Sequence, residues 1–186
     1  MSAISSRCFS VPSPLLVVLM GVSGSGKTTI GTLLAERIGA QFADADDFHP
    51  AANKAKMAAG IPLTDADRQP WLETLNGVLR RWRTAGEGGI LACSALKETY
   101  RVTLAEGMPQ GALQFVFLDG SKELIAERLA KRHHEFMTGK LLESQLNTLE
   151  RPREAICVVN DRSPEDVVEE ILRELKAGSG NAAATG

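Results

Sequence analysis

The sequence is poor in several features that mark particular classes of protein. It has only three cysteines in 186 residues, and they form no CxxC pair, which argues against a disulfide framework and the common zinc motifs. Cys93 and Cys157 lie within apolar, strand-like runs and are expected to be buried thiols in a reducing compartment, the cytoplasm. The net charge of −2 and the pI of about 6.0 provide no basic surface for a nucleic acid or an anionic membrane. No apolar run approaches the roughly 18 residues of a membrane span.

Internal repeats are absent as well, and both ends of the chain lack a clear pattern. Residues 1–13 and the small, apolar-poor segment 178–186 are expected to be disordered. The opening contains Ser and Arg but no acidic residue, a weak similarity to an organelle transit peptide that is outweighed by the simpler expectation of a frayed terminus. The apolar content of 44% suffices for one hydrophobic core, so residues 14–177 are predicted to form a single domain.

Within this domain, strand-like and helix-like segments alternate. Helices are predicted at Lys27–Ile38 and Pro50–Ala59, which both end at glycine, from Pro70 onward with Trp71 on the buried face, and near Ser163 at the end. Continuous apolar runs predict strands at Leu15–Met20, Gln41–Asp44, Ile90–Ser94, Leu113–Leu118 and Ala155–Val159. Because the connections are long enough for parallel pairing, the chain is predicted to form an α/β sheet covered on both faces.

The most specific motif spans residues 21–28 and matches G-x-x-x-x-G-K-S/T at every fixed position. It follows an apolar strand and opens a helix, so backbone N–H groups and the positive helix end can surround phosphate oxygens. Lys27 is expected to reach the β- and γ-phosphates, and the Thr28 hydroxyl to bind Mg²⁺. The predicted nucleotide site therefore comprises Gly21, Val22, Ser23, Gly24, Ser25, Gly26, Lys27, Thr28 and Thr29.

Three carboxylates follow the second predicted strand, at the sheet edge where ligands bind in open α/β folds. If the strand alternation continues, Asp44 and Asp46 face the same way and Asp47 faces away. One of the first two can hold Mg²⁺ and the other can orient or deprotonate an attacking hydroxyl, as phosphoryl transfer requires. An acidic turn in which Asp caps the next helix is the alternative, and it is the interpretation favoured for Asp47.

Three stretches of the sequence resemble gluconate kinases (gluconokinases) of the small P-loop type: DADDFHP, LTDADRQPWL at Leu63–Leu72 and CSALKETYR at Cys93–Arg101. The resemblance extends from about Leu16 to Leu175. It implies a nucleoside-monophosphate-kinase-like, three-layer α/β fold with a five-stranded parallel sheet and a mobile lid. It also implies ATP- and Mg²⁺-dependent phosphorylation of D-gluconate on its 6-hydroxyl, usually by a cytosolic homodimer.

Gluconate is a small polyol carboxylate, so its site needs cations for one end and hydrogen bonds for the rest. Arg68 and Arg101 are the predicted cations, because a guanidinium can hold a carboxylate through two hydrogen bonds. Lys97, Tyr100 and His49 complete the predicted substrate site. For these three the alternatives are a solvated charge, a packing residue and a structural histidine, respectively.

The two carboxylates Asp44 and Asp46 are then expected to have different roles, one toward the metal and one toward the substrate. Asp46 is the candidate that orients the 6-hydroxyl, while Asp44 and Thr28 form the candidate Mg²⁺ shell. The two carboxylates could exchange these roles, and positioning could matter more than proton removal, since a loose transition state asks little of a base.

The segment ERLAKRHHEFM resembles the lid of this family, which would span about 128–150 here. Arg128 and Arg132 are four residues apart on one helix side, so both can reach the same phosphate. Lid closure would exclude water and add positive charge around the transferred group; a solvated basic helix end is the alternative. The predicted catalytic residues are therefore Lys27, Asp46, Arg128 and Arg132.

The lid also departs from the family pattern. His134 stands where glycine is usual, Glu135 where histidine is usual, and Leu146 and Asn147 where Phe and Glu are common. These changes bear on lid motion and ATP affinity and leave the reaction class unchanged. Shikimate, adenylylsulfate and nucleoside-monophosphate kinases are the alternatives within the kinase class, and both long motifs argue against them. A non-catalytic nucleotide sensor is the alternative from another class, favoured only by the altered lid.

Overall fold

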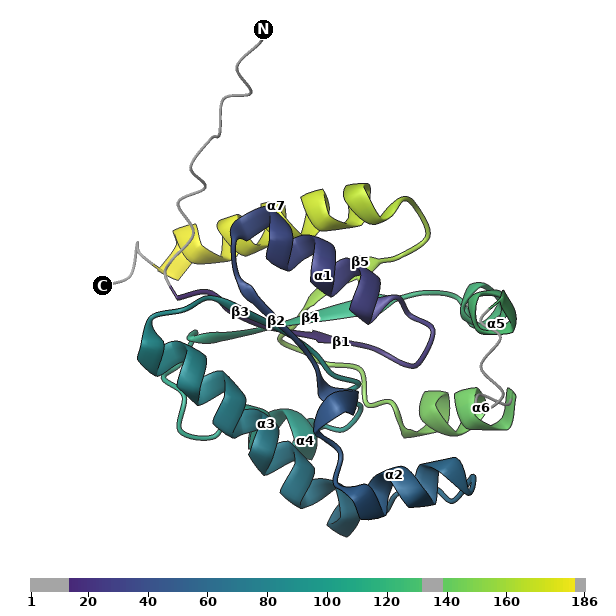
Figure 1. The fold of residues 1–186 in the computed structure, drawn as a ribbon. Helices are drawn as coiled ribbons and strands as arrows, with labels where there is room; N and C mark the ends of the chain where they lie inside the picture. Colours follow the sequence, from purple (N-terminus) through teal and green to yellow (C-terminus); the bar gives the residue numbers. More distant parts are fainter. Residues whose placement is uncertain (1–13, 132–138, 183–186) are drawn as a thin grey trace, which may run out of the picture.

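The computed structural model of the chain describes residues 14–131 and 139–182, which form a parallel sheet covered by helices (Figure 1). Its five strands stand in the order β2-β3-β1-β4-β5, and all neighbours are parallel. Each strand starts and ends within two residues of its predicted bounds: β1 (Leu16–Met20), β2 (Gln41–Asp44), β3 (Gly89–Ala92), β4 (Leu113–Asp119) and β5 (Ile156–Val159). The predicted parallel α/β sheet is confirmed, and its strand order comes from the structure alone.

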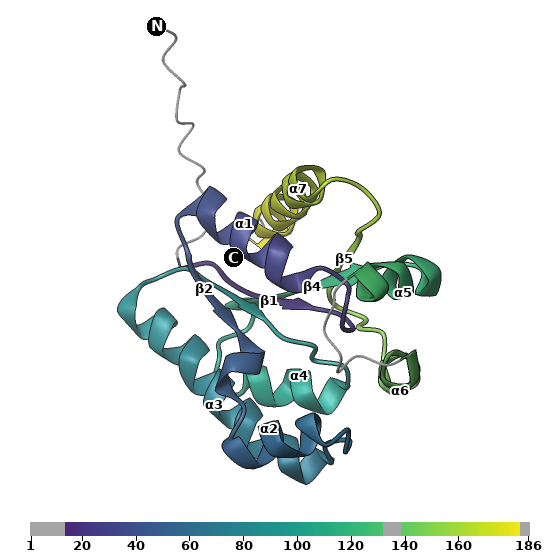
Figure 2. The ribbon, with the colours of Figure 1, turned by 45° about the vertical axis from the view of Figure 1, so that its right-hand side comes forward.

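Helices cover both faces of the sheet, which gives the predicted three layers (Figures 1 and 2). One face carries α1 (Lys27–Ile38) and α7 (Pro164–Ala182); the other carries α3 (Asp65–Ala85) and α4 (Glu98–Ala105). The remaining helices, α2 (Ala51–Ala58), α5 (Lys122–Lys131) and α6 (Gly139–Thr148), lie toward the end of the sheet at which the strands finish (Figure 1). None of the helices described combines the length and apolar character that crossing a bilayer requires.

The central strand β1 explains how the two cores form. All five of its residues are apolar and all five are buried. Val17 and Leu19 pack in the cluster under α1 and α7, whereas Val18 and Met20 pack in the cluster under α3 and α4. This is the two-residue alternation of a strand between two covered faces. Because β1 is held on both sides, the loop that follows it starts from a rigid point.

The helix around Pro70 begins earlier than the sequence analysis expected. It starts at Asp65, so Pro70 lies inside α3 and not in its first turn. Thr64 and Asp67 form a capping box, in which each side chain accepts a hydrogen bond from the other residue's backbone N–H. This start signal outweighed the preference of proline for a first turn. Trp71 is buried in α3, as predicted.

Two further expectations are corrected at the C-terminal part of the chain. Cys157 is exposed, because β5 is an edge strand and part of it stays open to solvent. The helix α7 continues to Ala182, past the expected start of a disordered tail at 178, since a helix nucleated by packing gains a backbone hydrogen bond with each added residue. Cys93 is buried as predicted. The expectation for residues 1–13 falls outside the described residues.

Candidate active site

The phosphate loop connects the end of β1 at Met20 to the start of α1 at Lys27. Gly26, the residue before the helix, has a φ of +95° that suits glycine. A Cβ on Gly26 would lie 2.5 Å from Nδ2 of Asn160, a side chain that is 4% exposed. Asn160 Nδ2 donates to the Ser25 carbonyl at 2.7 Å, so the loop rests on the connection after β5. No local pattern in the sequence pointed to this support.

Two hydrogen bonds join the phosphate loop to helix α6. The Ser23 N–H donates to Gln145 Oε1 at 2.7 Å, and Gln145 Nε2 donates to Ser23 Oγ at 3.1 Å. Lys27 Nζ donates to the loop carbonyls of Gly21 at 3.0 Å and Val22 at 3.2 Å. The side-chain amide oxygen of Gln145 thus accepts a hydrogen bond from a backbone N–H that, in the phosphate-loop motif, is expected to bind a phosphate oxygen. The sequence analysis missed Gln145, because a polar residue on a helix carries no sign of a partner 122 residues away.

Thr28 and Asp44, the predicted magnesium pair, are brought together by the structure. Thr28 Oγ1 donates to Asp44 Oδ2 at 2.8 Å, and the other oxygen of Asp44 accepts from the Asp46 N–H at 3.1 Å. A hydroxyl and a carboxylate oxygen side by side are hard ligands of the type that Mg²⁺ takes, with phosphate oxygens and waters completing its shell. The residues present therefore fit the metal.

Asp46 does not lie on the strand, so the expected alternation with Asp44 is wrong. The chain leaves β2 at Asp44 and turns into a short 3₁₀ helix, η1 (Ala45–Phe48), for which Asp44 is the N-cap. The Asp46 side chain is 88% exposed, and the groups around it remove part of its solvation. That partial desolvation, followed by the charge of Asp44, raises the pKa of Asp46, and the charge of Lys27 opposes the rise.

His49 is a buried residue of the predicted site, with 5% of its side chain exposed. Its ring stacks on Trp71 with centroids 4.2 Å apart and planes 12° from parallel. Its Nε2 lies 4.0 Å from Asp46 Oδ1. Burial, then the charges of Arg68 and Lys54, lowers the pKa of His49 to about 4. The ring is therefore neutral at pH 7 and has one N–H to donate.

The predicted cations Arg68 and Lys97 lie around one tyrosine and one carboxylate. Lys97 Nζ donates to both oxygens of Asp65, at 2.9 and 2.7 Å, and the Tyr100 hydroxyl donates to the same carboxylate. Arg68 donates to Tyr100 Oη at 3.5 Å and to the Leu63 carbonyl. Hydrogen bonds from Lys97 and Tyr100 lower the pKa of Asp65. The sequence analysis missed Asp65, although it stands within the quoted LTDADRQPWL motif.

Arg101 lies apart from this group. It is 9% exposed, and its Nη1 donates to the carbonyls of Ala95 at 3.0 Å and Leu96 at 3.3 Å. Ala95 has a φ of +43°, a conformation uncommon for a residue with a side chain, and Arg101 holds the connection that contains it. Burial lowers the pKa of the Arg101 guanidinium. A direct contact of Arg101 with the substrate stays a prediction.

The structure describes only some of the residues predicted to form the lid. Arg128 lies in the last turn of α5. Arg132, His134 and Glu135 fall outside the described residues. Ser121 caps α5, because its Oγ accepts from the Leu124 N–H at 3.2 Å.

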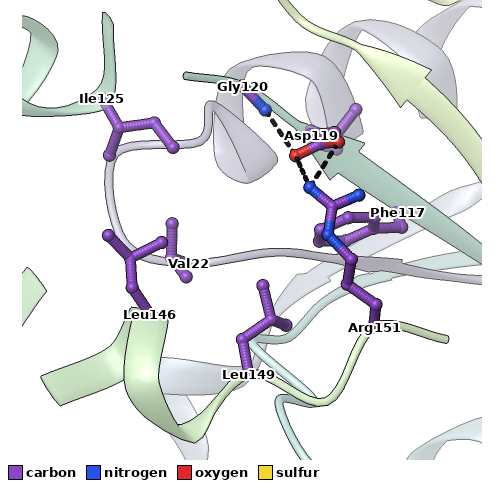
Figure 3. A pocket seen from close by; sticks show the side chains of 9 residues that line it. Val22, Phe117, Asp119, Gly120, Ile125, Leu146, Leu149 and Arg151 are labelled. Atoms are coloured by element: carbon purple, nitrogen blue, oxygen red, sulfur yellow. Dashed lines mark hydrogen bonds and ion pairs between the residues drawn. The ribbon is translucent and has the colours of Figure 1, made fainter. Parts of the chain in front are cut away.

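A hollow of about 260 Å³ lies between the phosphate loop and the helices α5 and α6 (Figure 3). Val22 enters it from the loop and Leu146 from α6, and an ion pair between Arg151 Nη2 and Asp119 Oδ2 at 2.9 Å closes one side (Figure 3). Among the predicted site residues that the structure describes, only Val22 lines this space. The hollow is therefore distinct from the row of polar residues just described.

Comparison with known proteins identifies the family. A family described as an AAA domain matches residues 16–154. A gluconokinase from Gluconobacter oxydans is 46% identical over 168 residues, which cover 88% of this chain and 93% of that protein. The chain belongs to the gluconokinase family. A crystal structure of a gluconokinase from Sinorhizobium meliloti has a TM-score of 0.82 at 42% identity and covers 93% of this chain and 98% of the other.

The gluconokinase relatives confirm the family resemblance and the P-loop kinase fold that the motifs predicted. A shikimate kinase from Aquifex aeolicus, which represents one of the alternatives, has a TM-score of 0.58 at 21% identity over 92% of this chain and all of that chain (100%). That likeness shows the fold alone. The comparisons therefore favour the gluconokinase family over its neighbours within the same fold.

Proposed function

We propose that the protein catalyses the transfer of the γ-phosphoryl group of ATP to the 6-hydroxyl of D-gluconate, giving 6-phosphogluconate and ADP. The observation that carries this proposal is a continuous row of polar side chains. Lys27 is close enough to Asp46 for its charge to oppose the rise in the pKa of Asp46. An oxygen of Asp46 in turn lies 4.0 Å from Nε2 of His49. Arg68 acts on the pKa of His49 and contacts Tyr100 at 3.5 Å. The row leads from a phosphate site to a carboxylate site, which is the layout a sugar-acid kinase needs.

The phosphate end binds and neutralises the nucleotide. The backbone N–H groups of the loop and the N-terminus of α1 would surround the β- and γ-phosphates, with Lys27 turning from the loop carbonyls toward them. Thr28 and Asp44 would hold Mg²⁺ beside these oxygens. The metal supplies positive charge at the phosphates when it is bound. From the family resemblance, Arg128 and Arg132 would add further positive charge at the phosphates.

The acceptor hydroxyl is oriented by Asp46 and His49. Its oxygen attacks the γ-phosphorus as the bond to the β-phosphate oxygen breaks, and the hydroxyl proton passes to the Asp46 carboxylate. A raised pKa makes this carboxylate a better proton acceptor than an ordinary aspartate. Neutral His49 can donate its one N–H to the same hydroxyl or its neighbour. Most of the rate enhancement is expected from positioning.

The far end of the site holds the carboxylate of the sugar acid. Lys97 and Tyr100 already hold one carboxylate, that of Asp65, with Arg68 beside them. The same donors suit a carboxylate of the substrate. We also propose, from the family, that the enzyme is a cytoplasmic homodimer that needs Mg²⁺ and has neither a nucleic-acid nor a membrane partner.

The test is ADP release at fixed MgATP with D-gluconate, other aldonic acids, shikimate, AMP or adenylylsulfate as acceptor. Turnover with gluconate alone is expected, and Lys27→Ala is expected to abolish it while leaving the thermal unfolding transition in place. Turnover with shikimate in place of gluconate would refute the substrate assignment. Binding of ATP in a calorimeter, with no turnover of any acceptor, would refute catalysis and favour a nucleotide sensor.

A further inference from the structure

Asn53 is a buried polar residue that the proposed reaction does not use. It lies in α2, four residues after His49 in the sequence, and is only 4% exposed. Buried amides are retained where their hydrogen bonds are satisfied, because an unsatisfied one is costly. The partners of Asn53 therefore indicate what it does.

The orientation of the Asn53 amide follows from its first partner. Its Nδ2 lies 2.8 Å from the Asp67 carbonyl oxygen, which can only accept, so a donor must face it. Asp67 belongs to the capping box of α3, and Lys56 Nζ also donates to its carboxylate at 2.7 Å. The side chain of Asn53 is thus anchored to the start of a neighbouring helix.

The same amide nitrogen, Nδ2, carries a second hydrogen. Nδ2 lies 3.5 Å from Nδ1 of His49. A neutral imidazole has one protonated and one unprotonated nitrogen. Since Asn53 presents a donor, the facing Nδ1 must accept, and the ring proton is left on Nε2. This nitrogen is the one that lies 4.0 Å from Asp46 Oδ1.

We propose that Asn53 is a positioning residue that fixes the Nε2–H tautomer of His49, so that His49 presents a hydrogen-bond donor beside the Asp46 carboxylate. The stack on Trp71 fixes the plane of the ring, and Asn53 fixes which nitrogen carries the proton. In the other tautomer, a lone pair on Nε2 would face the carboxylate and two N–H groups would face each other at Nδ1. The hydroxyl that His49 contacts and the effect on kcat rest on the proposed function, whereas the tautomer of His49 does not.

The test is nitrogen-15 NMR of histidine-labelled full-length protein at pH 7.5 without substrate, with His49→Gln used to assign the His49 signals. The wild-type protein is expected to show His49 protonated on Nε2 alone. Asn53→Ala is expected to give a mixture of tautomers and a kcat for gluconate reduced roughly tenfold, the effect of about one misdirected hydrogen bond. The KM for ATP should stay unchanged.

Asn76 provides a matched control, because it is a buried asparagine of α3 whose Nδ2 donates to the Leu104 and Glu106 carbonyls, both at 2.9 Å. Asn76→Ala is expected to reduce stability and leave the His49 tautomer unchanged. A wild-type His49 protonated on Nδ1, or Asn53→Ala with wild-type tautomer and kcat, would overturn the proposal. If Asn53→Ala does not fold, the wild-type spectrum alone still decides. Because the spectrum needs no substrate, failure of gluconate turnover would leave the tautomer result standing.

Discussion

His49 should make the protein sensitive to mild acid, because folding suppresses its protonation. Its pKa falls from an ordinary 6.5 to about 4 in the folded protein, through burial first and then the charges of Arg68 and Lys54. The unfolded chain therefore binds the proton more readily. The stability tied to neutral His49 is fully present above pH 6.5 and is lost as the pH falls toward 4.

The size of the effect follows from this difference in pKa. A shift of one pKa unit is worth about 1.4 kcal/mol, so the fall from pH 7.5 to pH 5 should cost about 2 kcal/mol of unfolding free energy. The side chain is 5% exposed, so solvent screening reduces this figure little. Typical domains are stable by roughly 5–15 kcal/mol, which makes a loss of this size measurable.

Urea unfolding of the wild-type protein and His49→Gln at several pH values between 7.5 and 5 measures the effect. The substitution also removes the contact with Trp71, which changes stability equally at every pH. The pH dependence of the difference between the two proteins is therefore the quantity of interest. The chain has only three histidines, and the other two, His133 and His134, are present in both proteins. A difference that stays constant between pH 7.5 and 5 would refute the account of His49.

Three other substitutions test the structure directly. Gly89→Ala should destabilise the fold by roughly 1–3 kcal/mol, because its Cβ would lie 2.1 Å from the Trp82 ring. Gly77→Ala should instead stabilise the fold by up to about 1 kcal/mol, because Gly77 lies inside α3 and a Cβ there would have no atom within 4 Å. Urea unfolding measures both changes, and equal shifts of the two urea midpoints would contradict both predictions. Gln145→Ala should lower the Kd of ATP roughly fivefold in calorimetry, since one hydrogen bond to Ser23 no longer competes with phosphate. Weaker ATP binding would mean that Gln145 holds the nucleotide.

Much of the phosphate site could be predicted from the sequence because its determinants are local. The loop of residues 21–28 needs glycines at fixed spacing between a strand and a helix, and all of these lie within one short segment. Thr28 and Asp44 could be paired because parallel strands end at the same sheet edge. The expectation for Asp46, two residues beyond the end of β2, failed because alternation ends where the extended backbone ends.

The sequence by itself thus determined the parallel α/β sheet, the phosphate loop and the family motifs. The tertiary structure alone decided the strand order and the hydrogen bonds between distant segments. Asn53 meets the Asp67 carbonyl 14 residues on, Lys97 meets Asp65 32 residues back, and Ser23 meets Gln145 122 residues on. Polar side chains form such pairs wherever helix packing happens to bring donors and acceptors within reach. Neither periodicity nor spacing in the sequence indicates which side chains will meet, so these contacts become visible only once the helices are packed.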